Sequence, residues 1–271
     1  MTESKIRVAI SGACGRMGKE LIRAVAEFSE FQLVSAFEKA SHPEIGTDAG
    51  ISAGLKELKM KIGSDAEAGI KLAELLIEFT FPEPTIEHLR IAVKYGTRMV
   101  IGTTGFSEKQ MQEIKKASEK IAILVSPNMS LGVNLLFYLA RQSAKILGAG
   151  YDLEVIEAHH RQKKDAPSGT ALKLAEALAE GRGWDLKEVA CYHRQGMIGA
   201  RPDKQIGIQT IRGGDIVGEH TAIFAGEGER IELTHRVSSR ATFAKGALRA
   251  GRWLMGKPPG LYSMQDYLEL V

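Results

Sequence analysis

The sequence of 271 residues has only two cysteines, Cys14 and Cys191, so no disulfide framework is expected and a reducing compartment is favoured. No apolar run approaches the length of a membrane span. The amino-terminal stretch MTESKIRVAI also lacks the cationic start and long apolar core of a signal peptide. We therefore expect a cytoplasmic protein with no membrane partner.

Neither sign of charge is in large excess, with 36 lysines and arginines against 33 aspartates and glutamates. The formal net charge is +3, which suits small anionic ligands and is too weak to predict binding to nucleic acid. Hydrophobic residues make up 44% of the chain, which is typical of a globular protein with a full core. There is no HExxH motif, and no metal-ligand spacing occurs among His42, His88, His193, His220 and His235. We expect no metal site.

The first 125 residues alternate between strand and helix patterns. Short β-branched or apolar runs predict buried strands at residues 5–11, 31–37, 75–79, 98–101 and 121–125. Apolar residues at three-to-four spacing predict helices at about residues 17–28, 83–95 and 107–120. This alternation predicts an α/β fold with a Rossmann-like, doubly wound parallel sheet.

The pattern changes near residue 130. A long helix is expected at residues 131–147, followed mainly by strands at residues 153–159, 205–211, 219–225 and 230–237. One strong helix, residues 169–180, lies among these strands, and the last two strands are expected to form a hairpin. A helix over about residues 241–255 follows. We interpret this part as an α+β segment with antiparallel or mixed pairing, and place the crossings between the two parts near residues 127–130 and 238–240.

A glycine-rich turn, Gly12-Ala-Cys-Gly15-Arg-Met-Gly18, joins the first strand to the first helix. A pyrophosphate can approach such a turn because side chains are absent and the helix start supplies N–H donors. Glu38, at the end of the second strand, is placed to accept hydrogen bonds from ribose hydroxyls, which favours NADH. Arg16 and Lys39 could instead neutralise a 2′-phosphate, which favours NADPH. The alternatives are a tight turn with no ligand or, less favoured, a reactive thiol at Cys14.

Two more loops follow strands of this sheet, at the edge where open α/β sheets bind ligands. They are Gly102-Thr103-Thr104-Gly105 and Ser126-Pro127-Asn128-Met129. Their backbone groups and small polar side chains suit a nicotinamide carboxamide. Taken alone each string is an ordinary turn, and its position makes it a candidate.

The segment Glu154–Ala171, EVIEAHHRQKKDAPSGTA, gathers histidines, lysines and a helix start. Histidine has the side-chain pKa nearest neutrality, and a nearby ammonium can donate a proton. The Pro-Ser-Gly-Thr sequence predicts a helix N-terminus whose hydroxyls and free N–H groups suit an anion. These features indicate a site that binds a carboxylate and moves protons. The plainer alternative is a solvated basic loop before an ordinary helix.

These motifs together resemble the 4-hydroxy-tetrahydrodipicolinate reductase family, formerly called dihydrodipicolinate reductase. The family motif E-x-H-H-x-x-K-x-D-A-P-S-G-T is matched without a gap from Glu157 to Thr170. The amino-terminal G-x-x-G-R-M-G, the Gly-Thr-Thr-Gly string and the N-x-S-x-G-V-N beginning at Asn128 match as well. The resemblance covers essentially the whole chain, and the long motif is highly specific.

The resemblance implies an oxidoreductase of the diaminopimelate route to lysine. It would reduce 4-hydroxy-tetrahydrodipicolinate, through its dehydrated cyclic imine, to tetrahydrodipicolinate with NADH or NADPH. His159 and Lys163 would be the catalytic acid–base residues. The dicarboxylate substrate would be bound by His160, Ser168, Gly169, Thr170 and Thr104. The dinucleotide would be lined by Gly12, Ala13, Cys14, Gly15, Arg16, Met17, Glu38, Lys39, Gly102, Thr103, Thr104, Ser126, Pro127, Asn128 and Met129.

By the same resemblance, residues 1–129 and 241–271 form a dinucleotide-binding domain. Residues 130–240 would form an inserted substrate-binding and oligomerisation domain of a homotetramer. The family often has arginine where this chain has Lys39, which lacks the bidentate fork, so the preference between NADH and NADPH stays open. Whether His159 or Lys163 is the immediate proton donor also stays open. The rival hypotheses are another two-domain dehydrogenase with a different acid–base set, and a non-catalytic dinucleotide sensor.

Overall fold

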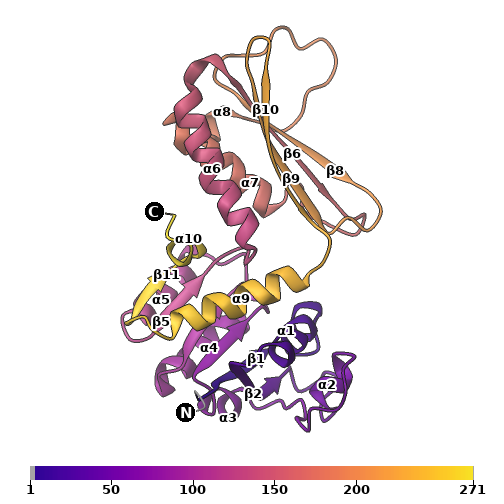
Figure 1. The fold of residues 1–271 in the computed structure, drawn as a ribbon, viewed down its shortest axis with the longest axis vertical. Helices are drawn as coiled ribbons and strands as arrows, with labels where there is room; N and C mark the ends of the chain where they lie inside the picture. The colour runs from indigo at the N-terminus through magenta and orange to yellow at the C-terminus, as the bar shows by residue number, and fades with distance from the viewer. Residues whose placement is uncertain (1–3, 271) are drawn as a thin grey trace. The chain divides into compact units, whose positions relative to one another are not determined.

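The computed structural model of the protein describes residues 4–270, which form two compact units (Figure 1). The first unit contains the chain up to Ser130 and the returning segment Arg240–Glu269. The second unit contains Leu131–Ser239. Each unit has its own sheet and its own buried apolar core.

The sheet of the first unit has six strands within the described residues, in the order β11-β5-β4-β3-β1-β2, and all neighbours are parallel. The strands are β1 (Ile6–Ser11), β2 (Phe31–Phe37), β3 (Leu75–Glu78), β4 (Arg98–Ile101), β5 (Ala122–Val125) and β11 (Gly260–Tyr262). The central strands β3 and β4 and most of β1 are buried, as a parallel sheet covered on both faces requires.

Helices cover both faces of this sheet. On one face α1 (Arg16–Glu27) contacts α9 (Ala241–Leu254), where Gly251 lets the helix approach the Leu75 side chain. On the other face α3 (Ala66–Lys71), α4 (Pro82–Tyr95) and α5 (Glu108–Ser118) share a core with Leu76. Because Leu75 and Leu76 are neighbours on β3, they point to opposite faces. The predicted Rossmann-like, doubly wound sheet is confirmed.

The second unit also has a sheet, ordered β10-β9-β6-β8-β7, and two long helices. Its elements are α6 (Leu131–Leu147), the short 3₁₀ helix Gly148–Gly150, β6 (Asp152–His159), α7 (Gly169–Arg182), α8 (Leu186–Val189), β7 (Ala190–Cys191), β8 (Ile206–Arg212), β9 (Gly218–Ala225) and β10 (Arg230–Val237). β8 is parallel to β6 and β7, while β9 is antiparallel to β6 and β10. Pairing is therefore mixed, and β9 and β10 form the expected hairpin.

Alternation along β6 sets up the candidate site of this unit. Leu153 and Val155 join the apolar core that also contains residues of α6 and α7. The next residues on the same face are Glu157 and His159, because side chains two positions apart point the same way. The register places Thr210 and His220 opposite Glu157, and Arg212 opposite His159. One face of the sheet is therefore apolar along most of its length and polar at the carboxyl end of β6.

Several short elements carry no clear pattern in the sequence. They are α2 (Ala49–Ser52), α3, α8, β7, β11 and α10 (Met264–Tyr267). The strand β11 is the most consequential, since three residues near the end of the chain extend the parallel sheet beside β5. None of the helices in the described part of the chain is long and apolar enough to cross a membrane.

Candidate active site

The glycine turn of the first unit is packed too closely for side chains. A Cβ atom on Gly18 would lie 2.1 Å from the carbonyl oxygen of Gly12, and one on Gly12 would lie 2.7 Å from Thr80 Cγ2. Gly12 also has φ of 64°, a left-handed conformation that glycine adopts at no steric cost. Gly15 begins α1 and provides no side-chain cap for its N-terminus. The first N–H groups of this helix therefore suit an anion such as a phosphate.

Polar groups beside the turn fit the rest of a dinucleotide. Glu38 Oε2 accepts a 3.4 Å hydrogen bond from Cys14 N, which holds the carboxylate next to the turn. The Arg16 and Lys39 side chains are exposed and make no ion pair with any described residue. Burial, and then the charge of Glu38, raises the pKa of the Cys14 thiol to about 11. Cys14 is thus a small buried residue of the turn, and the environment does not activate its sulfur.

The two loops after β4 and β5 present mainly their backbones. Thr103 and Ser126 are buried, and each bonds inside the unit: Thr103 Oγ1 to Thr85 Oγ1 at 3.0 Å, and Ser126 Oγ to Asn128 O at 2.8 Å. Met129 is buried too, whereas Thr104 and Pro127 are exposed. A ligand at this edge would meet the exposed Thr104 side chain and the backbone of the others.

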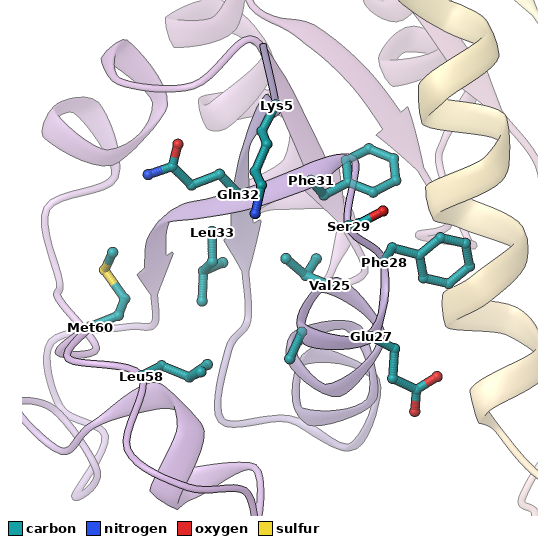
Figure 2. A pocket seen from close by; sticks show the side chains of 11 residues that line it. Lys5, Val25, Glu27, Phe28, Ser29, Phe31, Gln32, Leu33, Leu58 and Met60 are labelled. Atoms are coloured by element: carbon teal, nitrogen blue, oxygen red, sulfur yellow. The ribbon is translucent and has the colours of Figure 1, made fainter. Parts of the chain in front are cut away.

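The first unit also has a cavity of about 450 Å³ that is unrelated to this turn (Figure 2). It lies next to the last residues of α1 and the first residues of β2. The glycine turn, in contrast, comes before the first residue of α1. It is lined by Lys5, Val25, Ala26, Glu27, Phe28, Ser29, Phe31, Gln32, Leu33, Leu58 and Met60. None of the predicted site residues lines it, so we do not include it in the candidate site.

In the second unit, a buried carboxylate organises the polar end of the sheet. Glu157 is fully buried and accepts two hydrogen bonds of 2.7 Å from the Arg212 guanidinium. Its other donors are Ser168 N at 3.0 Å and Thr210 Oγ1 at 3.3 Å, and His159 Nδ1 lies 2.6 Å from Oε2. Burial raises the pKa of the Glu157 carboxyl, but the bonds from His159, Arg212 and Ser168 outweigh it and hold the pKa well below its usual range.

This carboxylate fixes the orientation and tautomer of His159. An ionised carboxylate can only accept hydrogen bonds, so Nδ1 of His159 carries a proton and donates it to Glu157. Nε2 is then the ring atom that can gain or lose a proton. It lies beside Gly218, where a Cβ atom would come within 3.1 Å. The arrangement is that of a histidine held by a buried carboxylate, with a glycine beside Nε2.

The ring of His220 packs against the ring of His159. The two rings meet edge to face with centroids 5.1 Å apart, and Ser168 Oγ lies 3.1 Å from His220 Nε2. Burial, and then the nearby His159, lowers the pKa of His220 to about 3, so its ring is neutral near pH 7. Its Nδ1 is buried without a hydrogen-bond partner.

The loop between β6 and α7 carries the lysines of the motif. Lys163 Nζ pairs with Asp165 at 2.8 Å, and Asp165 O in turn accepts a 2.7 Å bond from Arg212. Ser168 caps α7 by accepting a bond from Ala171 N at 3.1 Å, and it is 2% exposed. Its hydroxyl is thus occupied within the protein. Gly169 is exposed, Thr170 and His160 are partly exposed, and all three lie beside the start of α7 or the end of β6.

The structure brings one set of predicted residues together in each unit. His159, His160, Lys163, Ser168, Gly169 and Thr170 gather in the second unit, and the predicted dinucleotide residues gather in the first. Sequence reasoning missed the residues around the Glu157–His159 pair: Thr210 and Arg212, which bond to Glu157, and Gly218 and His220, which lie beside His159. Their signal is a polar residue at matching positions of neighbouring strands, which is visible only when the strand register is known. Among residues 4–270, no group of three or more His, Cys, Asp or Glu side chains is placed to hold a metal ion.

The sequence and fold can be compared with those of known proteins. The family model for the dihydrodipicolinate reductase N-terminus matches residues 6–129, and the model for its C-terminus matches residues 132–268. A 4-hydroxy-tetrahydrodipicolinate reductase of Syntrophotalea carbinolica is 50% identical over 265 residues, covering 98% of this chain and 99% of the relative. That of Polynucleobacter necessarius is 52% identical over 265 residues, with coverage of 98% and 99%.

Solved structures show the same likeness. A dipicolinate-bound dihydrodipicolinate reductase from Paenisporosarcina superposes with a TM-score of 0.75 at 28% identity, covering 97% of this chain and 99% of that one. An amine dehydrogenase from Mycobacterium smegmatis, at 13% identity and a TM-score of 0.62, shares the fold alone, with coverage of 97% and 96%. Both family models together span nearly the whole sequence, and the curated relatives share half of its residues. The chain therefore belongs to the dihydrodipicolinate reductase family.

Proposed function

We propose residue roles for this chain, which as a member of that family is an NAD(P)H-dependent 4-hydroxy-tetrahydrodipicolinate reductase of the diaminopimelate route to lysine. The observation that carries the proposal is the buried Glu157, whose charge is matched by Arg212 and whose Oε2 holds His159 Nδ1 at 2.6 Å. A histidine held in this way can exchange a proton at Nε2 without leaving a buried carboxylate uncompensated.

His159 and Lys163 are the proposed acid–base residues. When bound, the reduced nicotinamide supplies the hydride for the conjugated cyclic imine that forms once the 4-hydroxyl group leaves. The substrate atom that gains negative charge then needs a proton. His159 Nε2 and the Lys163 ammonium are the candidate donors, and the Lys163–Asp165 pair of 2.8 Å holds the lysine near the start of α7.

The substrate's two carboxylates are proposed to bind at the start of α7. The exposed N–H group of Gly169 and the hydroxyl and N–H groups of Thr170 lie in the first turn, where the helix dipole favours an anion. His160 is proposed to contribute from the end of β6. Because Ser168 is buried and caps the helix, we propose that it acts by fixing this turn and His220. Thr104 is proposed to meet both substrate and cofactor from its exposed loop.

Residues 1–129 and 241–271, which correspond closely to the first unit, are the proposed dinucleotide domain, and residues 130–240 are the proposed substrate and oligomerisation domain. The close-packed glycine turn, the uncapped start of α1 and the Glu38 carboxylate support a dinucleotide. We propose that both NADH and NADPH are accepted, since Glu38 suits ribose hydroxyls and the unpaired Arg16 and Lys39 suit a 2′-phosphate.

A cytoplasmic homotetramer is the proposed assembled form. The sheet face opposite α6 and α7 supports it. That face carries the Thr221–Thr234 pair of 3.0 Å, together with Ile156, Ile223 and the half-exposed Ile211. Partly exposed isoleucines across one sheet face are typical of surfaces that pack against another copy.

Replacing Lys163 with alanine tests the acid–base proposal. We expect Lys163→Ala to lower turnover by about 10²–10⁴, the usual scale for a positioned proton donor. Steady-state kinetics on the purified variant measure this. Lys164→Ala is the matched control, because Lys164 is exposed on the same loop and makes no ion pair with a described residue. Turnover of Lys163→Ala within a few-fold of that of Lys164→Ala would remove Lys163 from the mechanism.

The cofactor proposal predicts that NADH and NADPH differ in kcat/KM by less than about a hundredfold, roughly 2.7 kcal/mol. Lys39→Ala should lower kcat/KM for NADPH by about tenfold and leave NADH nearly unchanged, because only NADPH carries a 2′-phosphate for Lys39 to meet. The difference should shrink as salt is added, since an exposed charge is screened. Lys56→Ala, an exposed lysine of the same unit, is the control. An equal loss for both cofactors would show that Lys39 does not read the phosphate.

Dipicolinate, the ligand named for the Paenisporosarcina relative, should compete with the substrate of this chain. Thr170→Val keeps the side-chain shape and removes its hydroxyl, so dipicolinate binding should weaken by about 1.5–3 kcal/mol if that bond is made. NADH affinity should not change, because Thr170 and the glycine turn belong to different units. Calorimetry with each ligand measures both effects. Weaker NADH binding with unchanged dipicolinate binding would mean that the two units have been assigned the wrong ligands.

A further inference from the structure

A second buried carboxylate lies in the first unit, outside the residues assigned above. Glu78, the last residue of β3, is fully buried. Its Oε1 accepts hydrogen bonds from the backbone N–H and the hydroxyl of Thr80, and its Oε2 lies 2.6 Å from His88 Nδ1 on α4. The distance matches that between Glu157 and His159.

The two pairs differ in how their charge is compensated. Glu157 has the permanent cation Arg212 as well as its histidine. In the described part of the chain, Glu78 pairs with no lysine or arginine, and His88 is its only ion-pair partner. A buried carboxylate without compensation is strongly unfavourable, so Glu78 depends on His88 as well as on the two donors of Thr80. The Glu78–His88 pair is therefore tied to its present geometry, whereas Glu157 keeps a compensating charge from Arg212 whatever the state of His159.

The Glu78–His88 pair touches the carboxyl ends of four strands. Ser11 Oγ, at the end of β1, lies 3.3 Å from His88 Nδ1, and the Phe37 ring, at the end of β2, packs edge to face on His88 with centroids 5.1 Å apart. Glu78 itself ends β3, and its carbonyl accepts a 2.9 Å bond from Gly102 N after β4. These strand ends carry the Gly12 turn, Glu38 and the Gly102 loop, which are the proposed dinucleotide contacts.

The link to the glycine turn passes through Thr80. The backbone N–H and the hydroxyl of Thr80 both donate to Glu78. The methyl group of Thr80 lies 2.7 Å from the position that a Cβ of Gly12 would occupy. Ser11 precedes Gly12 directly. A change at Glu78 therefore reaches the turn from both sides, through Ser11–His88 and through Thr80.

We propose that Glu78 is a positioning residue for the dinucleotide: with His88 it sets the Gly12 turn and the Gly102 loop in the geometry that binds the cofactor. The proposal rests on the proposed dinucleotide role of the first unit. It assigns Glu78 no contact with the cofactor, and its effect passes through Ser11, Thr80 and the strand ends. A small displacement of binding groups is enough to weaken binding strongly.

The test uses Glu78→Gln in the full chain, with NADH binding measured by calorimetry in the absence of substrate. We expect the Kd for NADH to rise by about tenfold to a hundredfold. In turnover assays KM for NADH should rise by more than kcat falls, because the lost interactions serve binding. Dipicolinate affinity should fall much less than NADH affinity, because all of its proposed contacts except Thr104 belong to the other unit.

Thr97→Val is the matched control for simple destabilisation. Thr97 is buried in the same unit, and its hydroxyl donates to Ile70 O and Ala73 O. It directly precedes β4, so it lies at the amino ends of the strands, whereas Glu78 lies at their carboxyl ends. Thermal unfolding is expected to fall for both variants, while the Kd for NADH rises only for Glu78→Gln. If Thr97→Val weakens NADH binding equally, or if folded Glu78→Gln binds NADH like the parent, the positioning role is overturned.

Two milder variants keep the test decisive should Glu78→Gln fail to fold. Ser11→Ala removes the hydroxyl next to His88, and Thr80→Val removes the hydroxyl that bonds to Glu78; both leave the Glu78–His88 pair in place. Both variants should raise the Kd for NADH. An unchanged Kd in both would overturn the proposal. If the parent chain itself does not bind NADH, the dinucleotide role of the unit is wrong and this proposal falls with it. If the parent binds and all variants bind equally, only the positioning role fails.

Discussion

A buried carboxylate must be matched by charge and filled with hydrogen-bond donors, and the polar end of the second unit depends on this constraint at Glu157. Its donors come from β8, from the start of α7 and from the end of β6 itself. Removing a single partner would leave a charge buried without compensation, which costs about 3–5 kcal/mol. The same contacts that stabilise the end of this sheet therefore orient His159, so the proposed catalytic geometry is part of what holds the unit together.

The fold contains two buried glutamate–histidine pairs that differ in how the charge of the carboxylate is compensated. Arg212 is a permanent cation, so Glu157 stays ionised whatever the state of His159, and the histidine is left to exchange a proton at Nε2. Among residues 4–270, Glu78 has only His88 as an ion-pair partner, and the pair lies among buried groups at four strand ends. One pair therefore suits proton transfer and the other suits a rigid binding edge. The difference rests on one arginine, which reaches Glu157 from a neighbouring strand.

The sequence predicted the fold class and the family, and both are confirmed. It did so because strands buried on both faces read as β-branched runs, and because the Glu157–Thr170 motif is continuous in the chain. It could not predict β11, whose three residues pair beside β5 only because the chain returns through α9. Arg212 and His220 lie 55 and 52 residues from their partners Glu157 and Ser168, and only strand register brings them together. The sequence did not predict the Glu78–His88 pair, because a lone histidine in a helix gives no local sign of which carboxylate it contacts. The roles of the individual site residues stay predictions.

The central claim is that Glu157 fixes the proton on Nδ1 of His159 and leaves Nε2 to exchange. Nitrogen-15 NMR of histidine-labelled protein, with the His159 signals assigned by their loss in His159→Asn, measures this most directly. The account predicts that Nδ1 stays protonated across the pH range in which the protein is folded, while any change with pH occurs at Nε2. Loss of the Nδ1 proton as the pH rises, with Nε2 still protonated, would contradict it.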